Sequence, residues 1–114
     1  MFSNALKRLE DALMDTTDVY VSPGVDRERY FSELIADIRS HTCVPLEVTA
    51  EVMPPGFPDE DVGRTITGLC VARRDGYWLV YRPESDLFYC FWGQEAGALG
   101  AYGVFGSPLY CWTA

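Results

Sequence analysis

The stretch from Thr65 to Trp92 constrains the fold most, because it holds three strand-like runs separated by two turn signals. Each run is rich in β-branched and aromatic residues, which pack well on a pleated surface. Asp75-Gly76 separates the first two runs, and Asp-Gly favours a hairpin because a type I′ turn needs positive φ at both central positions. Glu84-Ser85-Asp86 separates the second run from the third. We therefore predict a double β-hairpin in this part of the chain.

The turn lengths predict which side chains share a face of the sheet. A two-residue loop at Asp75-Gly76 places Val71 on the same face as Trp78, and Tyr81 on the opposite face, because side chains alternate along a strand. If the second loop has three residues, Trp92 joins the Trp78 face and Tyr89 joins the Tyr81 face. A four-residue loop reverses that second assignment, and the sequence leaves both lengths open.

Both faces of the predicted sheet are apolar, whichever loop length holds. Antiparallel sheets usually have one polar face, so a sheet that is apolar on both sides must be covered twice. Helices can cover one face, and the other needs loops, a partner, a ligand or a second copy. We predict that Trp78 and Trp92, or else Tyr81 and Tyr89, form an accessible aromatic patch, since large apolar patches mark interaction sites. The alternative is that arginine side chains cover the tryptophans and leave an ordinary mixed surface.

Two amphipathic helices are predicted before the sheet. Apolar residues recur at helical spacing over residues 3–15, where Ser3 is a suitable N-cap. The same spacing recurs from Asp26, which is itself a suitable N-cap, to about His41. Both patterns are typical of helices that pack one face against a core.

An acidic surface is predicted after the second helix. Residues 44–53 alternate apolar and polar, which indicates a half-exposed strand, and residues 54–63 form a loop because three prolines forbid regular structure. The carboxylates of this surface are Glu47 and Glu51 on the strand and Asp59, Glu60 and Asp61 on the loop. A solvated acidic surface is the simplest interpretation, and contact with a basic partner is the functional one.

The C-terminal part is predicted to return the chain to the sheet. Residues 93–106 contain five glycines, but neither a convincing following helix nor a Gly-Lys-Ser/Thr motif, so we interpret them as a flexible crossing rather than a phosphate-binding loop. Residues 109–113 are predicted to form a last strand. The expected fold is a single α+β domain over residues 1–114, with two N-terminal helices packed on one face of a four- to five-stranded antiparallel sheet.

Charge narrows the classes of partner. The chain of 114 residues has a net charge of −8, whereas phosphate binding needs a basic surface and anionic membranes repel an acidic one. We therefore expect neither nucleic-acid nor membrane binding. The chain has no apolar run of membrane-spanning length, and its N-terminus does not resemble a signal peptide, so the expected location is cytoplasmic.

Catalytic and metal-binding motifs are not recognisable. The four cysteines are widely spaced without a C-x-x-C pair, so we predict four free, mostly buried thiols and neither metal nor cofactor. His41 is the single histidine, and Cys43, two residues away, is a poor catalytic partner because such pairs usually converge from distant segments. We therefore expect a protein that is not an enzyme and has no catalytic residue.

The preferred function is a small acidic binding module, an inhibitor or immunity-type protein that neutralises a basic partner such as a toxin or a nucleic-acid enzyme. This is an analogy of class, since a net negative charge steers a cationic partner. The alternatives are a homodimeric scaffold or chaperone that uses an aromatic sheet face, or a cup that binds an apolar ligand. The candidate partner-binding residues are Glu47, Glu51, Asp59, Glu60, Asp61, Trp78, Trp92, Tyr81 and Tyr89.

Overall fold

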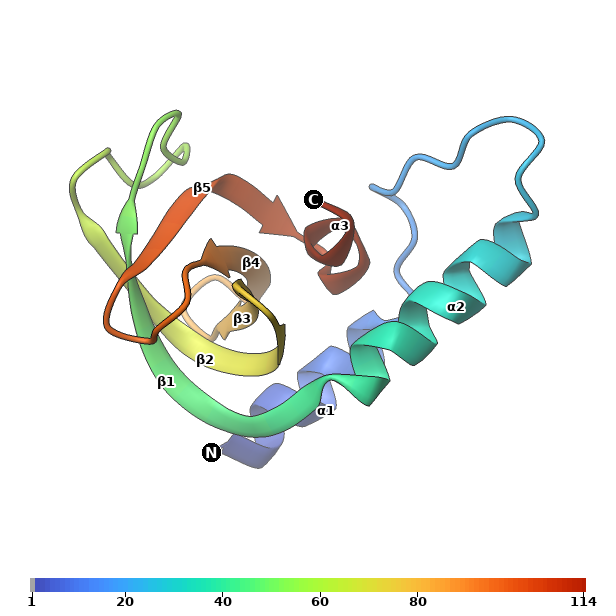
Figure 1. Cartoon of the computed structure of the whole chain (residues 1–114), viewed down its shortest axis with the longest axis horizontal. Helices are drawn as coiled ribbons and strands as arrows, with labels where there is room; N and C mark the ends of the chain where they lie inside the picture. Colours follow the sequence, from blue (N-terminus) through green and yellow to red (C-terminus); the bar gives the residue numbers. More distant parts are fainter. Residues whose placement is uncertain (1) are drawn as a thin grey trace.

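The strands curl into a closed barrel, with helices on its outside (Figure 1). The computed structural model describes residues 2–114, and side chains from Asn4 onward, so the predicted Ser3 cap lies outside the described side chains. The elements are α1 (Phe2–Ala12), α2 (Arg27–Ser40), β1 (Thr42–Val52), β2 (Thr65–Arg74), β3 (Tyr77–Arg82), β4 (Leu87–Trp92), β5 (Leu99–Gly106) and α3 (Pro108–Thr113). The predicted α+β class is confirmed.

The odd number of strands sets the direction of the strand pair that closes the barrel. Consecutive strands pair antiparallel from β1 to β5, so the first and last strands run in the same direction. They close the barrel through a short parallel pairing of Ala50–Val52 with Leu99–Ala101. One side of each strand therefore faces the barrel interior, and the other faces the helices or solvent.

Two apolar clusters explain why both faces of the sheet are hydrophobic. The interior cluster includes Val48, Val80 and Phe91, and the outer cluster joins β2, β3 and β4 to residues of all three helices. Burial in two separate clusters satisfies both faces within one chain, because burying apolar area is favourable on either side of the sheet. Because the sheet curls into a barrel, one of its apolar faces is buried inside the barrel and does not need a partner, a ligand or a second copy to cover it.

The predicted first hairpin is confirmed, but its turn type and its register differ from the prediction. Arg74 pairs with Tyr77 across the two-residue loop, and Gly76 has a φ of +70°. Asp75 does not share this positive φ, so the turn is not of type I′. Val71 is the extra residue of a β-bulge, because Cys70 pairs with Val80 and Ala72 with Leu79. One extra residue reverses the alternation of side chains, so the predicted placement of Val71 on the Trp78 face is wrong.

The second hairpin has the four-residue loop, which the sequence left open. Arg82 pairs with Leu87 across residues 83–86. Tyr89 therefore lies with Trp78 in the interior cluster, and Trp92 packs against the outer cluster.

The C-terminal prediction is wrong in both parts. The glycine-rich segment contributes β5, and residues 108–113 form α3 rather than a strand. Ser107 begins this helix because its hydroxyl accepts a hydrogen bond from the Tyr110 amide at 3.2 Å. Pro108 follows at the first helical position, where its missing N–H costs nothing.

The N-terminal helices have different surroundings. α1 lies against β1 and β2, whereas α2 extends away from the barrel and contacts α3 (Figure 1). The predicted cap of α2 is confirmed, because the Asp26 carboxylate accepts a hydrogen bond from the Arg29 amide at 3.1 Å. The chain then passes from α2 directly into β1.

Candidate functional site

A groove of about 680 Å³ opens where β1 and β5 meet. Glu51 of β1 and Met53 just after it line one side. Trp92 at the end of β4, the loop that follows it and the start of β5 line the other side. Tyr102 of β5 borders the groove next to Trp92. The groove is open to solvent, and its lining combines the aromatic residues Trp92 and Tyr102 with the acidic residue Glu51.

Glycines give this groove its shape. Gly93 has a φ of +155°, and a Cβ built on it would lie 2.4 Å from the carbonyl oxygen of Ala98. The loop can therefore turn back on itself only because this residue has no side chain. At Gly100 a Cβ would lie 3.0 Å from the Tyr102 ring, so the same absence lets that ring fold down beside the groove.

Trp92 and Tyr102 provide the accessible aromatic surface of the groove. Their rings meet edge to face, with centroids 5.6 Å apart. Trp92 is partly exposed, and 44% of Tyr102 is accessible to solvent. Trp92 also contacts Tyr77 edge to face at 5.5 Å, which fixes its indole from behind. An aromatic pair held in this way loses little conformational freedom when a ligand packs on it.

The predicted aromatic patch is otherwise wrong. Trp78, Tyr81 and Tyr89 are only 4%, 7% and 2% exposed, so each predicted pair has at least one buried member. Closure of the barrel encloses Trp78 and Tyr89, and Tyr81 lies in the outer cluster. The sequence did not single out Tyr102, because its glycine-rich surroundings indicate a flexible crossing. Its spacing from the other aromatic residues also gives no clear signal.

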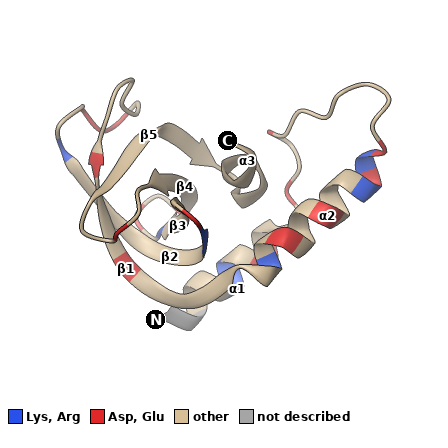
Figure 2. Ribbon diagram, in the orientation of Figure 1, with Lys and Arg blue, Asp and Glu red and all other residues tan. Residues whose placement is uncertain are grey.

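The predicted acidic residues do not form one surface. Glu47 and Glu51 are exposed on β1, as the alternation indicated, but only Glu51 lines the groove with Trp92. Glu47 borders a separate hollow of about 410 Å³ beside α1. Asp59 and Asp61 are exposed on the following loop, and the acidic positions of β1 and this loop are coloured red in Figure 2.

Glu60 differs from its acidic neighbours because it turns inward. Its carboxylate lies 3.9 Å from the Arg82 guanidinium, and its side chain is 24% exposed. Arg82 is 5% exposed and stacks on the Tyr89 ring at 5.1 Å, with Tyr89 Oη as a hydrogen-bond acceptor at 3.4 Å. The pair links the acidic loop to the end of the barrel, which favours a structural role for Glu60.

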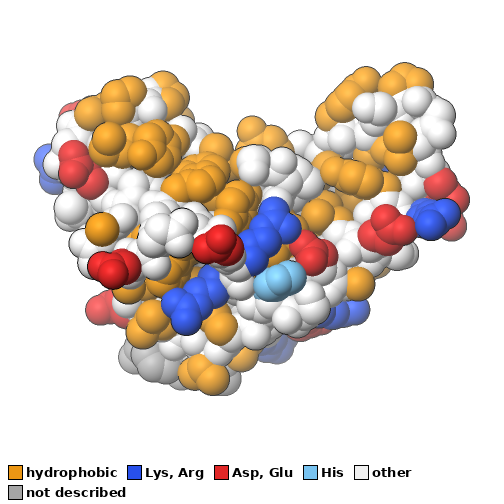
Figure 3. Space-filling model, in the orientation of Figure 1, with side chains coloured by type: hydrophobic (Ala, Val, Ile, Leu, Met, Phe, Trp, Pro, Cys, Tyr) orange, Lys and Arg blue, Asp and Glu red, His pale blue; other side chains and the backbone are white. Residues whose placement is uncertain are grey.

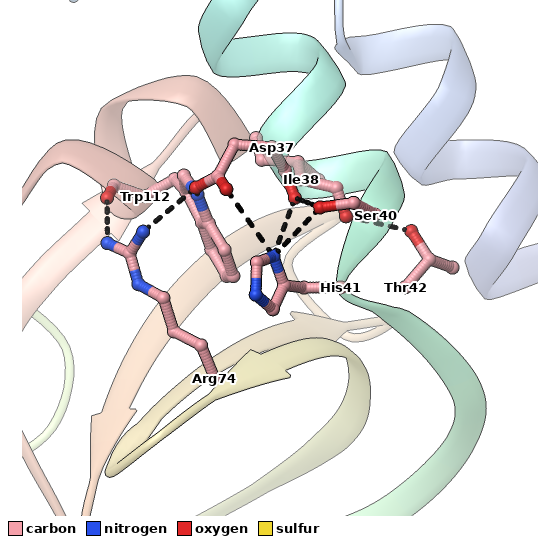
Figure 4. Close-up of polar contacts among 7 residues, drawn as sticks. All are labelled: Asp37, Ile38, Ser40, His41, Thr42, Arg74 and Trp112. Carbon is pink, nitrogen blue, oxygen red and sulfur yellow. Dashed lines mark hydrogen bonds and ion pairs between the residues drawn. The ribbon is translucent and has the colours of Figure 1, made fainter.

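A second polar cluster joins α2, β2 and α3 (Figure 4). Asp37 accepts hydrogen bonds from Arg74 at 2.9 Å and from the Trp112 indole N–H at 2.7 Å. The Arg74 guanidinium lies 4.4 Å from the Trp112 ring centroid and also donates to the Trp112 carbonyl. These contacts fasten the C-terminal helix to the barrel and to α2.

His41 and Ser40 border this cluster without forming a catalytic triad. His41 Nδ1 lies 3.1 Å from the Ser40 hydroxyl and 3.5 Å from an Asp37 carboxylate oxygen (Figure 4). Both contacts therefore converge on one ring nitrogen, whereas a triad uses one nitrogen for the acid and the other for the nucleophile. His41 Nδ1 also lies 2.8 Å from the Asp37 carbonyl, as expected for a residue that ends a helix.

Other features of the described part of the chain bear on the classes of site. The predicted free thiols are confirmed: Cys70, Cys90 and Cys111 are buried and Cys43 is partly buried. Within residues 2–114, His, Cys, Asp and Glu side chains do not gather in a group of three or more suited to a metal ion. Over the same residues, none of the helices has the length and apolar character needed to cross a membrane.

Comparison with protein-family models, curated proteins and solved structures finds no match for this chain.

Proposed function

We propose that this protein is a binding module, without catalytic activity of its own, that recognises a basic segment of a partner protein in the groove between β1 and β5. The observation that carries this proposal is the meeting of the Trp92–Tyr102 pair with the Glu51 carboxylate in one open groove. Aromatic side chains dominate binding hot spots, and a bordering carboxylate favours Lys or Arg in the ligand.

The charge of the whole chain supports a basic partner. A net charge of −8 on 114 residues attracts cationic partners and repels nucleic acids. Hydrophobic side chains gather over β5 and over the loop after β1 on the face drawn in Figure 3, so this side of the barrel offers apolar contact beside its carboxylates. In this proposal the protein acts as an inhibitor or immunity-type protein of a basic toxin or nucleic-acid enzyme, by occupying a basic surface that such an enzyme needs.

The test is a selection from a random peptide display library with the full chain as bait. We expect enriched peptides to combine Lys or Arg with aromatic or aliphatic residues, and Trp92→Ala or Tyr102→Ala to weaken their binding at least tenfold. Tyr102→Ala is the safer variant because its side chain is 44% exposed, and circular dichroism checks the fold of both. Enrichment of acidic peptides, or affinity that is unchanged in both variants, contradicts the proposal.

Charge reversal supplies a matched control. Glu51→Lys changes the groove, whereas Glu28→Lys makes the same charge change at an exposed position on α2. We expect the first variant to lose more affinity for basic peptides than the second. Equal losses would locate the interaction outside the groove.

A homodimer is the second candidate, and one observation favours it. Val44 and Leu46 on β1 are 84% and 47% exposed, although both are apolar. A second copy that packs on β1 would bury them. Sedimentation equilibrium tests this alternative, since a β1 dimer should weaken in a Val44→Glu variant while a monomer at every concentration removes the candidate.

A further inference from the structure

Two cysteines lie together at the start of the barrel, away from the groove. Cys43 on β1 and Cys70 on β2 are 27 residues apart in sequence, and their sulfur atoms are 4.0 Å apart. Cys43 is partly exposed, whereas Cys70 is 1% exposed. A reagent in solvent can therefore reach the Cys43 thiol, whereas the Cys70 thiol is buried next to it.

The strand pairing around Cys43 is irregular. Thr42 pairs with Ala72 and Leu46 with Cys70, so four steps along β1 correspond to two along β2. Cys43 lies within this bulged segment, outside the regular ladder. The ladder is interrupted at this point, and a disulfide requires the two sulfur atoms to move from 4.0 Å to about 2.05 Å apart.

The ionisation of the two thiols is unequal. The pKa of Cys43 is lowered to about 7, mainly by its hydrogen bond with the Cys70 thiol, and the positive charge of Arg73 adds to this against the opposing effect of burial. The Cys70 thiol also lies 3.4 Å from the Ala72 carbonyl, which is a second acceptor for its proton. The pKa of Cys70 is raised, first by its hydrogen bond to Cys43 and then by burial. Cys43 is therefore the thiolate near neutral pH and the better nucleophile.

We propose that Cys43 and Cys70 form a redox-active dithiol that small disulfides of the glutathione class oxidise to an intramolecular disulfide. The Cys43 thiolate attacks one sulfur of oxidised glutathione, which forms a mixed disulfide and expels one glutathione thiolate. Cys70 then loses its proton to solvent and attacks the Cys43 sulfur, which expels the second glutathione thiolate. The two cysteine sulfurs lose two electrons in total, and two glutathione thiols are formed.

The first step prepares the second. The raised pKa of Cys70 depends mainly on the neighbouring Cys43 thiolate. A mixed disulfide at Cys43 removes that negative charge, so Cys70 ionises more readily once Cys43 has reacted. Cys43 thus acts as the attacking thiol and Cys70 as the resolving thiol.

Cys90 and Cys111 serve as internal controls. Both are fully buried, and burial raises the pKa of each thiol. Their sulfur atoms point to backbone carbonyls, that of Cys111 to Phe88 at 3.3 Å. We expect neither to react while the protein is folded.

The experiment equilibrates the full folded chain in glutathione redox buffers, quenches with acid and measures intact mass and cysteine-containing peptides. Oxidised wild-type protein should lose two hydrogens, with the crosslink mapped to Cys43 and Cys70. Cys70→Ala should stop with one glutathionyl group on Cys43, and Cys43→Ala should stay fully reduced. The alkylation rate of Cys43 relative to Cys90 and Cys111 in the wild-type protein gives a measurement that needs no variant, and it should exceed theirs at least a hundredfold.

Several results would overturn the proposal. These are four intact thiols in the most oxidising buffer, a crosslink between other cysteines, or a wild-type protein that keeps glutathione on Cys43 without closing the disulfide. Equal alkylation of all four thiols in the folded wild-type protein would also overturn it.

Discussion

At the scale of single residues, the hydrogen bond from Cys70 sets the ionisation of Cys43. The pKa of Cys43 is about 7 with that donor present, against an ordinary value of 9.0. Cys70→Ala removes the donor, so we expect the pH midpoint of Cys43 alkylation to rise towards the ordinary value. Iodoacetamide kinetics across the neutral range measure the midpoint, with Cys90 and Cys111 as unreactive references. An unchanged midpoint in the variant would show that Cys70 does not lower the pKa of Cys43.

A second residue-scale prediction concerns Asp86, which ends the loop between β3 and β4 with a φ of +55°. Its carboxylate accepts hydrogen bonds from Arg8 Nε at 2.9 Å and from the Tyr81 hydroxyl at 2.7 Å. The Arg8 bond, followed by the Tyr81 bond, lowers the pKa of Asp86 below its ordinary value of 3.8. The folded state therefore binds this proton less readily than the unfolded state, and the stabilisation is present above pH 3.8 and lost as pH falls through the folded pKa.

Asp86→Asn tests this dependence, since Asn also tolerates positive φ and changes mainly the charge. We expect the variant to be less stable than wild type in urea unfolding near neutral pH, and the difference to shrink as pH falls below 3.8. Glu95→Gln is the matched control, an exposed carboxylate near another turn, and should leave the free energy of unfolding unchanged. A constant difference at every pH would assign the effect of Asp86 to loop conformation instead of charge.

At the scale of elements, the short helix α3 is anchored to the rest of the protein by its buried side chains. Leu109, Cys111 and Trp112 are at most 1% exposed. Trp112→Ala should lower the free energy of unfolding by about 3–5 kcal/mol, because it leaves a large cavity. Trp112→Phe keeps most of the ring but loses the indole donor to Asp37, so we expect a smaller loss, measured by the same urea titration. Equal stability of the Ala variant and wild type would show that α3 is not part of the cooperative unit.

The errors of sequence interpretation at this scale have physical causes. Ser107-Pro108 is an N-cap and first-turn pair, and it could have indicated α3, but the aromatic residues that follow favour strands by intrinsic propensity. Their burial against the outer cluster decides the outcome, since tertiary contacts override weak local preferences. In β5 the glycines concealed a strand because they weaken the alternating pattern, although they permit the close approach of Tyr102 to Gly100.

At the scale of the whole molecule, barrel closure determines what is accessible. The sequence predicted the hairpin at Asp75-Gly76, the α2 cap at Asp26 and the outward direction of Glu51, because local turn chemistry and alternation encode these features. It could not predict that β5 returns to β1, since pairing between distant strands leaves no local pattern. Closure encloses Trp78 and Tyr89 and brings Glu51, Trp92 and Tyr102 to one groove, so the site depends on the least predictable contact of the fold.

The last prediction at this scale concerns how electrostatic steering affects the association rate, and it rests on the proposed basic partner. Glu51→Lys and Glu28→Lys each replace one negative charge with one positive charge, so both reduce the net charge of −8 equally. Association with a selected basic peptide should slow with added salt in wild type, because ions screen exposed charges beyond about 10 Å at 0.1 M. Both variants should associate more slowly at low salt, whereas only Glu51→Lys should also dissociate faster, since Glu51 lines the groove. Stopped-flow kinetics at several ionic strengths measure the two rates. An association rate that is flat across ionic strength would rule out steering, and faster dissociation in the Glu28 variant alone would move the contact from the groove to α2.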